Sequence, residues 1–199
     1  MSLDEVARFI DFQPDLSGVP PEEDRTEIAM VLVKEADEIK AAAPRKTNPW
    51  EFDQAITLEV LPRYLFAIGL LDAHIDDTPG DDKARVQRAG YITDVGLCLM
   101  AALLSYRGRR RTGDLGADDL ARARALSDLA ISTFLTVPAD QRDEGNWYNL
   151  GSLYELSGRV DDAIRAFERS HFIARGNDWS KMAAEALADV RAGKTTPFP

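Results

Sequence analysis

Hydrophobic residues recur along this chain at intervals of three or four positions, the spacing that places them on one face of an α-helix. Ile28, Val31 and Ile39 follow this spacing, as does the apolar series from Trp50 to Leu71. The alternation typical of strands is nearly absent. The pattern therefore predicts an all-α chain of about eight helices, which cover residues 2–10, 21–43, 49–75, 83–106, 117–137, 146–157, 160–175 and 178–192.

Helix-starting and helix-breaking residues set the limits of these elements. Ser2 and Glu5 form the S-x-x-E pattern of a capping box. Pro21 suits the first turn of the second helix, because its fixed φ angle is compatible with that position. Pro62 lies inside the third apolar series and lacks the backbone N–H that a helix interior uses. We therefore expect a kink, or two abutting helices, at Pro62.

The most regular unit is residues 144–177, a 34-residue segment that predicts two helices joined at Gly158. Gly151 has no side chain, so the second helix can approach the first closely at that point, and Gly158 suits a tight turn. The residues that we expect to form the packing faces of the two helices are Trp147, Leu150, Gly151, Tyr154, Ala163, Phe167 and Ser170.

This unit resembles a tetratricopeptide repeat, whose pattern is W-x2-L-G-x2-Y followed by A-x3-F and a proline. The matching positions, with the turn glycine, are Trp147, Leu150, Gly151, Tyr154, Gly158, Ala163 and Phe167, whereas Arg175 stands in place of the proline. The resemblance implies antiparallel helical hairpins stacked as a short α-solenoid, with a concave surface that binds a protein or peptide. On the first helix of the unit, the residues that would face a partner are Tyr148, Asn149, Ser152 and Glu155.

A single repeat cannot bury its own hydrophobic faces, so the rest of the chain should supply similar units. Ala130 and Phe134 reproduce the A-x3-F spacing, and Val95 with Gly96 corresponds to the Leu-Gly pair of the preceding helix. We therefore expect one domain, residues 1–199, with an N-terminal helical segment (1–80), a degenerate repeat-like hairpin (81–143), the repeat itself (144–177) and a capping helix (178–192).

The net charge of −10 comes from the first half of the chain. Residues 1–100 hold 20 Asp and Glu against 10 Lys and Arg, whereas residues 101–199 hold 14 of each. An acidic surface repels nucleic-acid phosphates and suits a basic protein partner. The one basic cluster ends a long apolar helix, where the helix dipole favours cations; it comprises Arg107, Arg109, Arg110 and Arg111.

An acidic loop supports an alternative interpretation of the sequence. Five carboxylates and one imidazole lie within a short stretch, and Mg²⁺ or Ca²⁺ prefers such oxygen ligands. The residues are Asp72, His74, Asp76, Asp77, Asp81 and Asp82. The alternative function is therefore a helical-bundle enzyme or metal-binding protein that uses this loop. The simpler interpretation is an exposed connection in which Asp81 or Asp82 caps the next helix.

Little else in the sequence indicates catalysis. The two histidines are His74 and His171, and Cys98 lies in an apolar run, where a thiol is usually inert. Phosphate-binding loops, nucleophile elbows and zinc-binding helices are absent from the sequence. One cysteine, and an apolar run (Val95–Leu104) too short for a membrane span, favour a cytoplasmic protein. We expect a non-enzymatic adaptor or regulator without cofactors, membrane contacts or nucleic-acid partners, for which self-association stays open.

Overall fold

The computed structural model of this chain describes residues 3–20, 24–43, 49–110, 115–195 and 197. Every regular element within these residues is helical, so the predicted all-α fold is confirmed. The elements are α1 (Leu3–Phe9), α2 (Arg25–Ala42), α3 (Pro49–Ala55), the π-helical turn η1 (Ile56–Val60), α4 (Leu61–Asp77), α5 (Asp82–Arg110), α6 (Ala117–Thr136), α7 (Glu144–Leu156), α8 (Val160–Ala174) and α9 (Asp178–Arg191).

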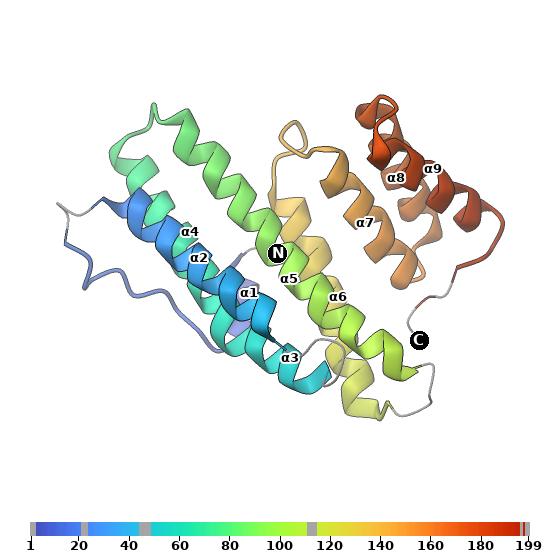
Figure 1. Cartoon of the computed structure of the whole chain (residues 1–199), viewed down its shortest axis with the longest axis horizontal. Helices are drawn as coiled ribbons and strands as arrows, with labels where there is room; N and C mark the ends of the chain where they lie inside the picture. Colours follow the sequence, from blue (N-terminus) through green and yellow to red (C-terminus); the bar gives the residue numbers. More distant parts are fainter. Residues whose placement is uncertain (1–2, 21–23, 44–48, 111–114, 196, 198–199) are drawn as a thin grey trace.

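The main helices are arranged as antiparallel pairs that lie side by side, in the order of the sequence (Figure 1). In these pairs α2 packs against α4, α5 against α6, and α7 against α8. Neighbouring pairs meet where α4 contacts α5 and where α6 contacts α7. The last helix, α9, packs against α8 and also reaches α7. The N-terminal α1 lies against α6 and α4.

The first pair is held by polar contacts at both ends. Arg25 of α2 pairs with Asp77 of α4 at 2.6 Å, and the Tyr64 hydroxyl donates to Asp37 at 2.9 Å. The second helix is described from Arg25 onward, and Pro21, at which the sequence suggested a first helical turn, lies outside the described residues. The Asp24 carboxylate accepts from the backbone N–H of Thr26 and of Glu27 and so caps the helix. The predicted capping box includes Ser2, which lies outside the described residues.

Pro62 changes the hydrogen bonding of its helix without ending it. The Leu61 N–H bonds to the carbonyl of Ile56, five residues back, instead of following the α-helical pattern. Proline has no N–H for the carbonyl four residues earlier, and a π-helical turn absorbs such a disturbance. The chain therefore passes from α3 through η1 directly into α4, and the disturbance expected at Pro62 takes the form of this π-helical turn.

A buried carboxylate joins the two halves of the molecule. Asp53 of α3 is 6% exposed and accepts a hydrogen bond from the Tyr106 hydroxyl of α5 at 2.6 Å. The Arg122 guanidinium of α6 donates to both oxygens of Asp53, at 3.1 and 3.2 Å, and covers the Phe9 ring of α1. Four helices thus share one polar network, in which the buried charge is both paired and hydrogen-bonded.

Two of the pairs contain the same contact between a glycine and a phenylalanine. A Cβ atom added to Gly151 in α7 would lie 2.6 Å from the ring of Phe167 in α8. A Cβ atom added to Gly96 in α5 would lie 2.9 Å from the ring of Phe134 in α6. Both rings are fully buried. The α5/α6 pair therefore repeats, with longer helices, the close approach that residues 144–177 suggested for α7/α8.

Alanine at Gly151 should therefore destabilise the protein. The Cβ atom has to displace a buried ring, and such overpacking costs roughly 1–3 kcal/mol. Gly90→Ala in α5 is the matched control, because nothing lies within 4 Å of its added Cβ. That variant should gain up to about 1 kcal/mol from helix propensity. Urea unfolding of both variants measures the difference, and equal stabilities would contradict the close-contact interpretation.

Two helical stretches are long and apolar enough to cross a membrane when the helices are taken whole. They are Trp50–Asp77 and Asp82–Tyr106. Neither stretch is an uninterrupted apolar run, so the sequence pattern did not predict them. In this fold 56% and 44% of their most apolar windows are buried inside the protein, and core helices pass the same test of length and composition.

Candidate functional site

A cleft of about 510 Å³ lies between the N-terminal half of α5 and the connection from α6 to α7. We refer to it as the α5–α7 cleft. One of its walls is a stripe of α5 residues spaced three or four apart, and the opposite wall is formed by the end of α6, the connection and the first turn of α7. Its lining residues are Val86, Ala89, Gly90, Thr93, Asp94, Val137, Gln141, Asp143 and Asn146.

Asp94 is the lining residue with the most perturbed acidity. Burial raises the pKa of its carboxyl group to about 6, an effect that the Lys40 charge opposes and the Asp37 charge reinforces. No hydrogen bond reaches this carboxylate from any described residue. It directly precedes the apolar run Val95–Leu104 of this core helix, where burying a charged group is unfavourable. A perturbed group in a concave site is a candidate functional residue.

Asn146 adds unused hydrogen-bonding capacity on the other wall. The side chain is 5% exposed, and its Oδ1 accepts from the Thr93 hydroxyl at 3.2 Å. No described residue accepts a hydrogen bond from its Nδ2, although a buried amide normally uses its donors. Asp143 positions this residue, because its carboxylate caps α7 by accepting from the Asn146 N–H at 2.7 Å.

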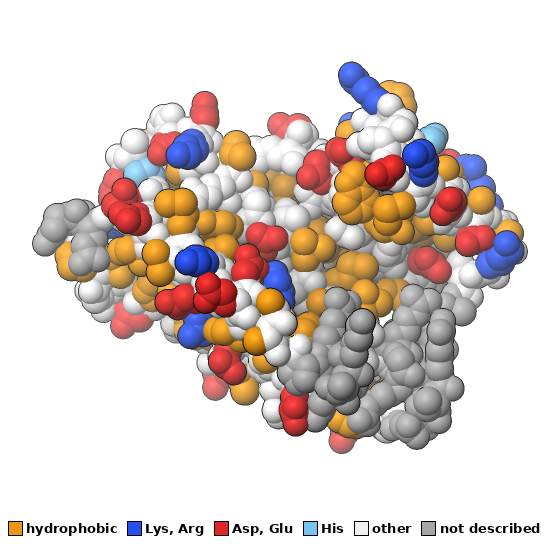
Figure 2. Space-filling view, in the orientation of Figure 1, with side chains coloured by type: hydrophobic (Ala, Val, Ile, Leu, Met, Phe, Trp, Pro, Cys, Tyr) orange, Lys and Arg blue, Asp and Glu red, His pale blue; other side chains and the backbone are white. Residues whose placement is uncertain are grey.

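The middle of the cleft is open because Gly90 has no side chain to fill it. Nothing lies within 4 Å of a Cβ atom added there, and Val86, one turn earlier, is 72% exposed. Its lining contains two carboxylates and no Lys or Arg. Farther along the same face, Figure 2 shows acidic side chains spread over the α2–α4 end of the molecule. The site therefore combines apolar walls with an excess of negative charge.

The residues expected to face a partner from α7 have different environments in the structure. Tyr148, expected to face a partner, is half-buried, and its ring packs between Phe167 and Trp179, with centroid distances of 5.5 and 5.4 Å. The sequence pattern missed this because α9 supplies the covering side chain. Asn149, Ser152 and Glu155 are all half-buried on α7. The Ser152 hydroxyl donates to the Tyr148 carbonyl.

The expected packing residues of the unit lie mostly in the core. Fully buried members are Leu150, Ala163 and Phe167, while Tyr154 is 8% exposed. Gly158 has a φ of +72°, which its turn requires. Trp147 is half-buried below the Arg142 guanidinium, and its indole Nε1 is buried with no partner among the described residues. Ser170 donates to the Glu144 carbonyl and so links α8 to α7.

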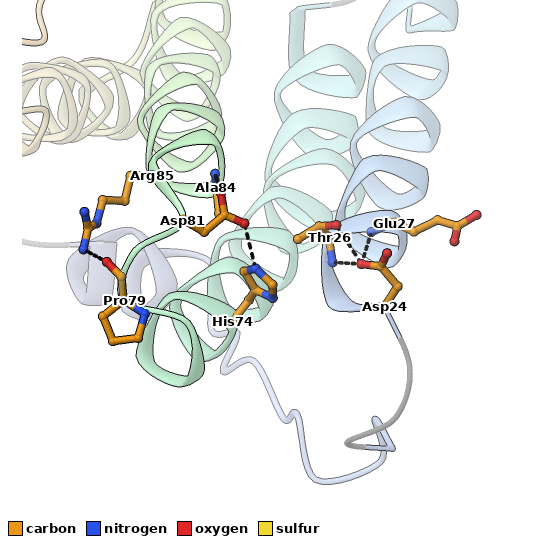
Figure 3. A network of polar contacts seen from close by, with 8 residues as sticks. All are labelled: Asp24, Thr26, Glu27, His74, Pro79, Asp81, Ala84 and Arg85. Atoms are coloured by element: carbon orange, nitrogen blue, oxygen red, sulfur yellow. Dashed lines mark hydrogen bonds and ion pairs between the residues drawn. The ribbon is translucent and has the colours of Figure 1, made fainter.

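The acidic loop between α4 and α5 serves to cap and join helices (Figure 3). The Asp81 carboxylate accepts from the Ala84 N–H at 3.0 Å and also contacts the His74 ring at 3.0 Å. The capping bond, together with the His74 contact, lowers the pKa of Asp81. The remaining paired carboxylates of the loop bind arginines, in the pairs Asp72–Arg88, Asp77–Arg25 and Asp82–Arg85.

The same loop therefore does not gather its carboxylates around one point. Among the residues that the structure describes, no group of three or more His, Cys, Asp or Glu side chains could hold a metal ion. Asp76 is exposed and takes part in none of these ion pairs. The interpretation of the loop as an exposed connection with a capping aspartate agrees with these contacts.

The remaining candidate groups are packed away from the cleft. Burial raises the pKa of the Cys98 thiol to about 12, as expected for an unreactive core cysteine. His171 lies at the protein surface, where its Nδ1 is 2.8 Å from the Ser180 hydroxyl of α9. The arginine cluster from residue 107 to residue 111 lies outside the described side chains.

Comparison of the chain with protein-family models, curated proteins and solved structures gives no match.

The residues that form the α5–α7 cleft were not predicted from the sequence. Gly90, Thr93 and Asp94 were assigned to a long apolar helix (83–106), and Asn146 to the start of the helix 146–157. One signal was present: an aspartate between Ile92 and Val95 is unusual in an apolar helix. The partner wall could not have been found in this way, because it comes from a segment more than forty residues later in the chain.

Asp94→Asn should stabilise the protein at neutral pH. The folded-state pKa of Asp94 is raised, so the folded protein binds this proton more tightly than the unfolded chain does, and stability falls as the pH rises through about 6. Asparagine removes that loss. Thermal unfolding should therefore give a higher Tm for the variant at about pH 7.5 and no advantage near pH 3, below the unfolded pKa of about 3.9. A pH-independent difference would contradict the assignment; Glu38→Gln, at an exposed site, is the control.

Removing the Asp81 side chain should lower the thermal stability, because α5 loses its capping carboxylate. Asp76→Ala in the same loop should leave the Tm unchanged, since Asp76 is exposed and forms no hydrogen bond or ion pair with a described residue. Isothermal titration of the wild type with Mg²⁺ and Ca²⁺ should give no binding heat at millimolar cation. Binding that Asp76→Ala abolishes would instead support the metal-loop hypothesis.

Proposed function

We propose that this chain binds a segment of a partner protein in the α5–α7 cleft, and that it works as an adaptor or regulator without catalysing a reaction. One observation carries the proposal: the cleft of about 510 Å³ has apolar walls that hold a carboxylate and a nearly buried amide with unused hydrogen-bonding capacity. Polar groups placed in this way within an apolar recess are typical of ligand-binding sites.

The resemblance of residues 144–177 to a tetratricopeptide repeat supports the same proposal. The repeated glycine–phenylalanine contact, Gly96 with Phe134 and Gly151 with Phe167, gives the chain two hairpins built on one packing rule. We propose that these hairpins act as a short solenoid-like stack. In such a stack the binding surface lies between successive units, where the α5–α7 cleft is found.

The α7 surface extends this site. Asn149 lies one helical turn beyond Asn146, and Ser152 follows at the next turn. A peptide longer than the cleft would therefore reach the residues that the sequence analysis assigned to a partner, with the exception of the packed Tyr148 ring. The net charge of −10 favours a basic partner.

Affinity selection with a phage-displayed library of random dodecapeptides tests the proposal. Peptides enriched on the wild type are synthesised and titrated by fluorescence anisotropy. Gly90→Leu fills the open part of the cleft without meeting any neighbouring atom at its Cβ, so it should abolish their binding while the folded state persists. Asn149→Ala is the comparison variant and should weaken binding only modestly.

The outcomes separate the possible surfaces. Loss of binding in Gly90→Leu, with an unchanged circular dichroism spectrum and Tm, supports docking in the cleft. Peptides that bind Gly90→Leu as tightly as the wild type contradict it, and greater sensitivity to Asn149→Ala would place the docking surface on α7. Failure to enrich any peptide also counts against the proposal.

A further inference from the structure

The two walls of the α5–α7 cleft offer complementary hydrogen-bonding groups. On α5, the Asp94 carboxylate can only accept, and no described residue donates to it. On α7, the Nδ2 of Asn146 can only donate, and no described residue accepts from it. Both residues line the same cleft, and Thr93, the neighbour of Asp94 in α5, bonds to the Asn146 side chain at 3.2 Å.

The charges around Asp94 favour a positively charged occupant. Lys40 is the one cation that acts on this carboxylate, and Lys40 is already paired with Asp37 at 2.7 Å. Across the cleft, Asp143 adds a second carboxylate. The titratable groups that face Asp94 from the packed elements are Asp37 and Lys40 of α2, Tyr64 of α4, Cys98 of α5 and, across the cleft, Asp143.

We infer that the α5–α7 cleft takes a lysine or arginine side chain of the partner segment, whose cation binds Asp94 while a backbone carbonyl of the same segment accepts from Nδ2 of Asn146. This inference rests on the proposed function. A cation would supply the donor that Asp94 lacks, and a charge-assisted hydrogen bond is stronger than a neutral one. The apolar walls at Val86 and Val137 would cover the aliphatic stem of the side chain.

The direct test uses small probes rather than the unidentified partner. N-acetyl-lysine N-methylamide and N-acetyl-arginine N-methylamide are titrated into the ¹⁵N-labelled protein, with the norleucine and citrulline analogues as neutral controls. The cationic probes should shift the amide resonances of Gly90, Thr93, Asp94 and Asn146, and the neutral ones should not. Shifts of equal size for both kinds of probe would overturn the inference.

Substitutions of opposite effect then identify the binding group. Asp94→Asn should weaken the cationic probe about tenfold or more, whereas Glu38→Gln makes the same change of charge at an exposed site and should have little effect. Lys40→Gln removes the competing cation and should strengthen binding. Binding should also weaken as the pH falls below about 6, where Asp94 takes up a proton. An unchanged affinity in Asp94→Asn rejects the assignment.

Failure of this inference is distinguishable from failure of the proposed function. The peptides selected on the wild type are resynthesised with norleucine in place of lysine and citrulline in place of arginine. If these peptides keep their affinity and still fail to bind Gly90→Leu, then the cleft docks a partner but does not recognise its cation. If no peptide depends on the cleft, the proposed function itself is wrong.

Discussion

A phenylalanine ring lies directly against a helical glycine in each of the two C-terminal pairs, and the arrangement of that half of the molecule depends on these two contacts. Phe134 occupies the space in front of Gly96, and Phe167 the space in front of Gly151. Any larger residue would separate the helices, since interiors are too closely packed to absorb a methyl group without movement. Towards the preceding pair, α7 packs more closely against α6 than against α5, and the α5–α7 cleft lies between α5 and the start of α7.

The charged carboxylate of Asp94 lowers the free energy of unfolding. Its raised pKa means that the folded protein favours the neutral form, so the charged form reduces stability at neutral pH. The buried carboxylate of Asp53 is different, since Tyr106 and Arg122 satisfy it. Under the proposed function, the partner supplies the hydrogen-bond donor that the Asp94 carboxylate lacks, which gives this destabilising group a role in recognition.

The acidic loop shows why proximity in the sequence does not make a site. Its carboxylates are close in the chain, yet they are divided between the C-terminal part of α4 and the start of α5. Most of them have a nearer partner there: Asp72 pairs with Arg88, and Asp81 caps α5 beside His74. Helix ends attract aspartates for electrostatic reasons, so such a loop becomes acidic without any ligand.

The sequence by itself determined the helices, the turn at Gly158 and the pairing of α7 with α8, because these depend on local periodicity and on contacts between neighbouring segments. Tertiary structure alone decided the environment of Tyr148, which α9 covers, and the location of the cleft, whose walls at Asp94 and Asn146 come from helices distant in the chain. Such contacts depend on how finished helices pack, and no periodicity records that. The π-helical turn before Pro62 belongs to the same class, since a proline predicts a disturbance but the surrounding packing decides how the helix absorbs it.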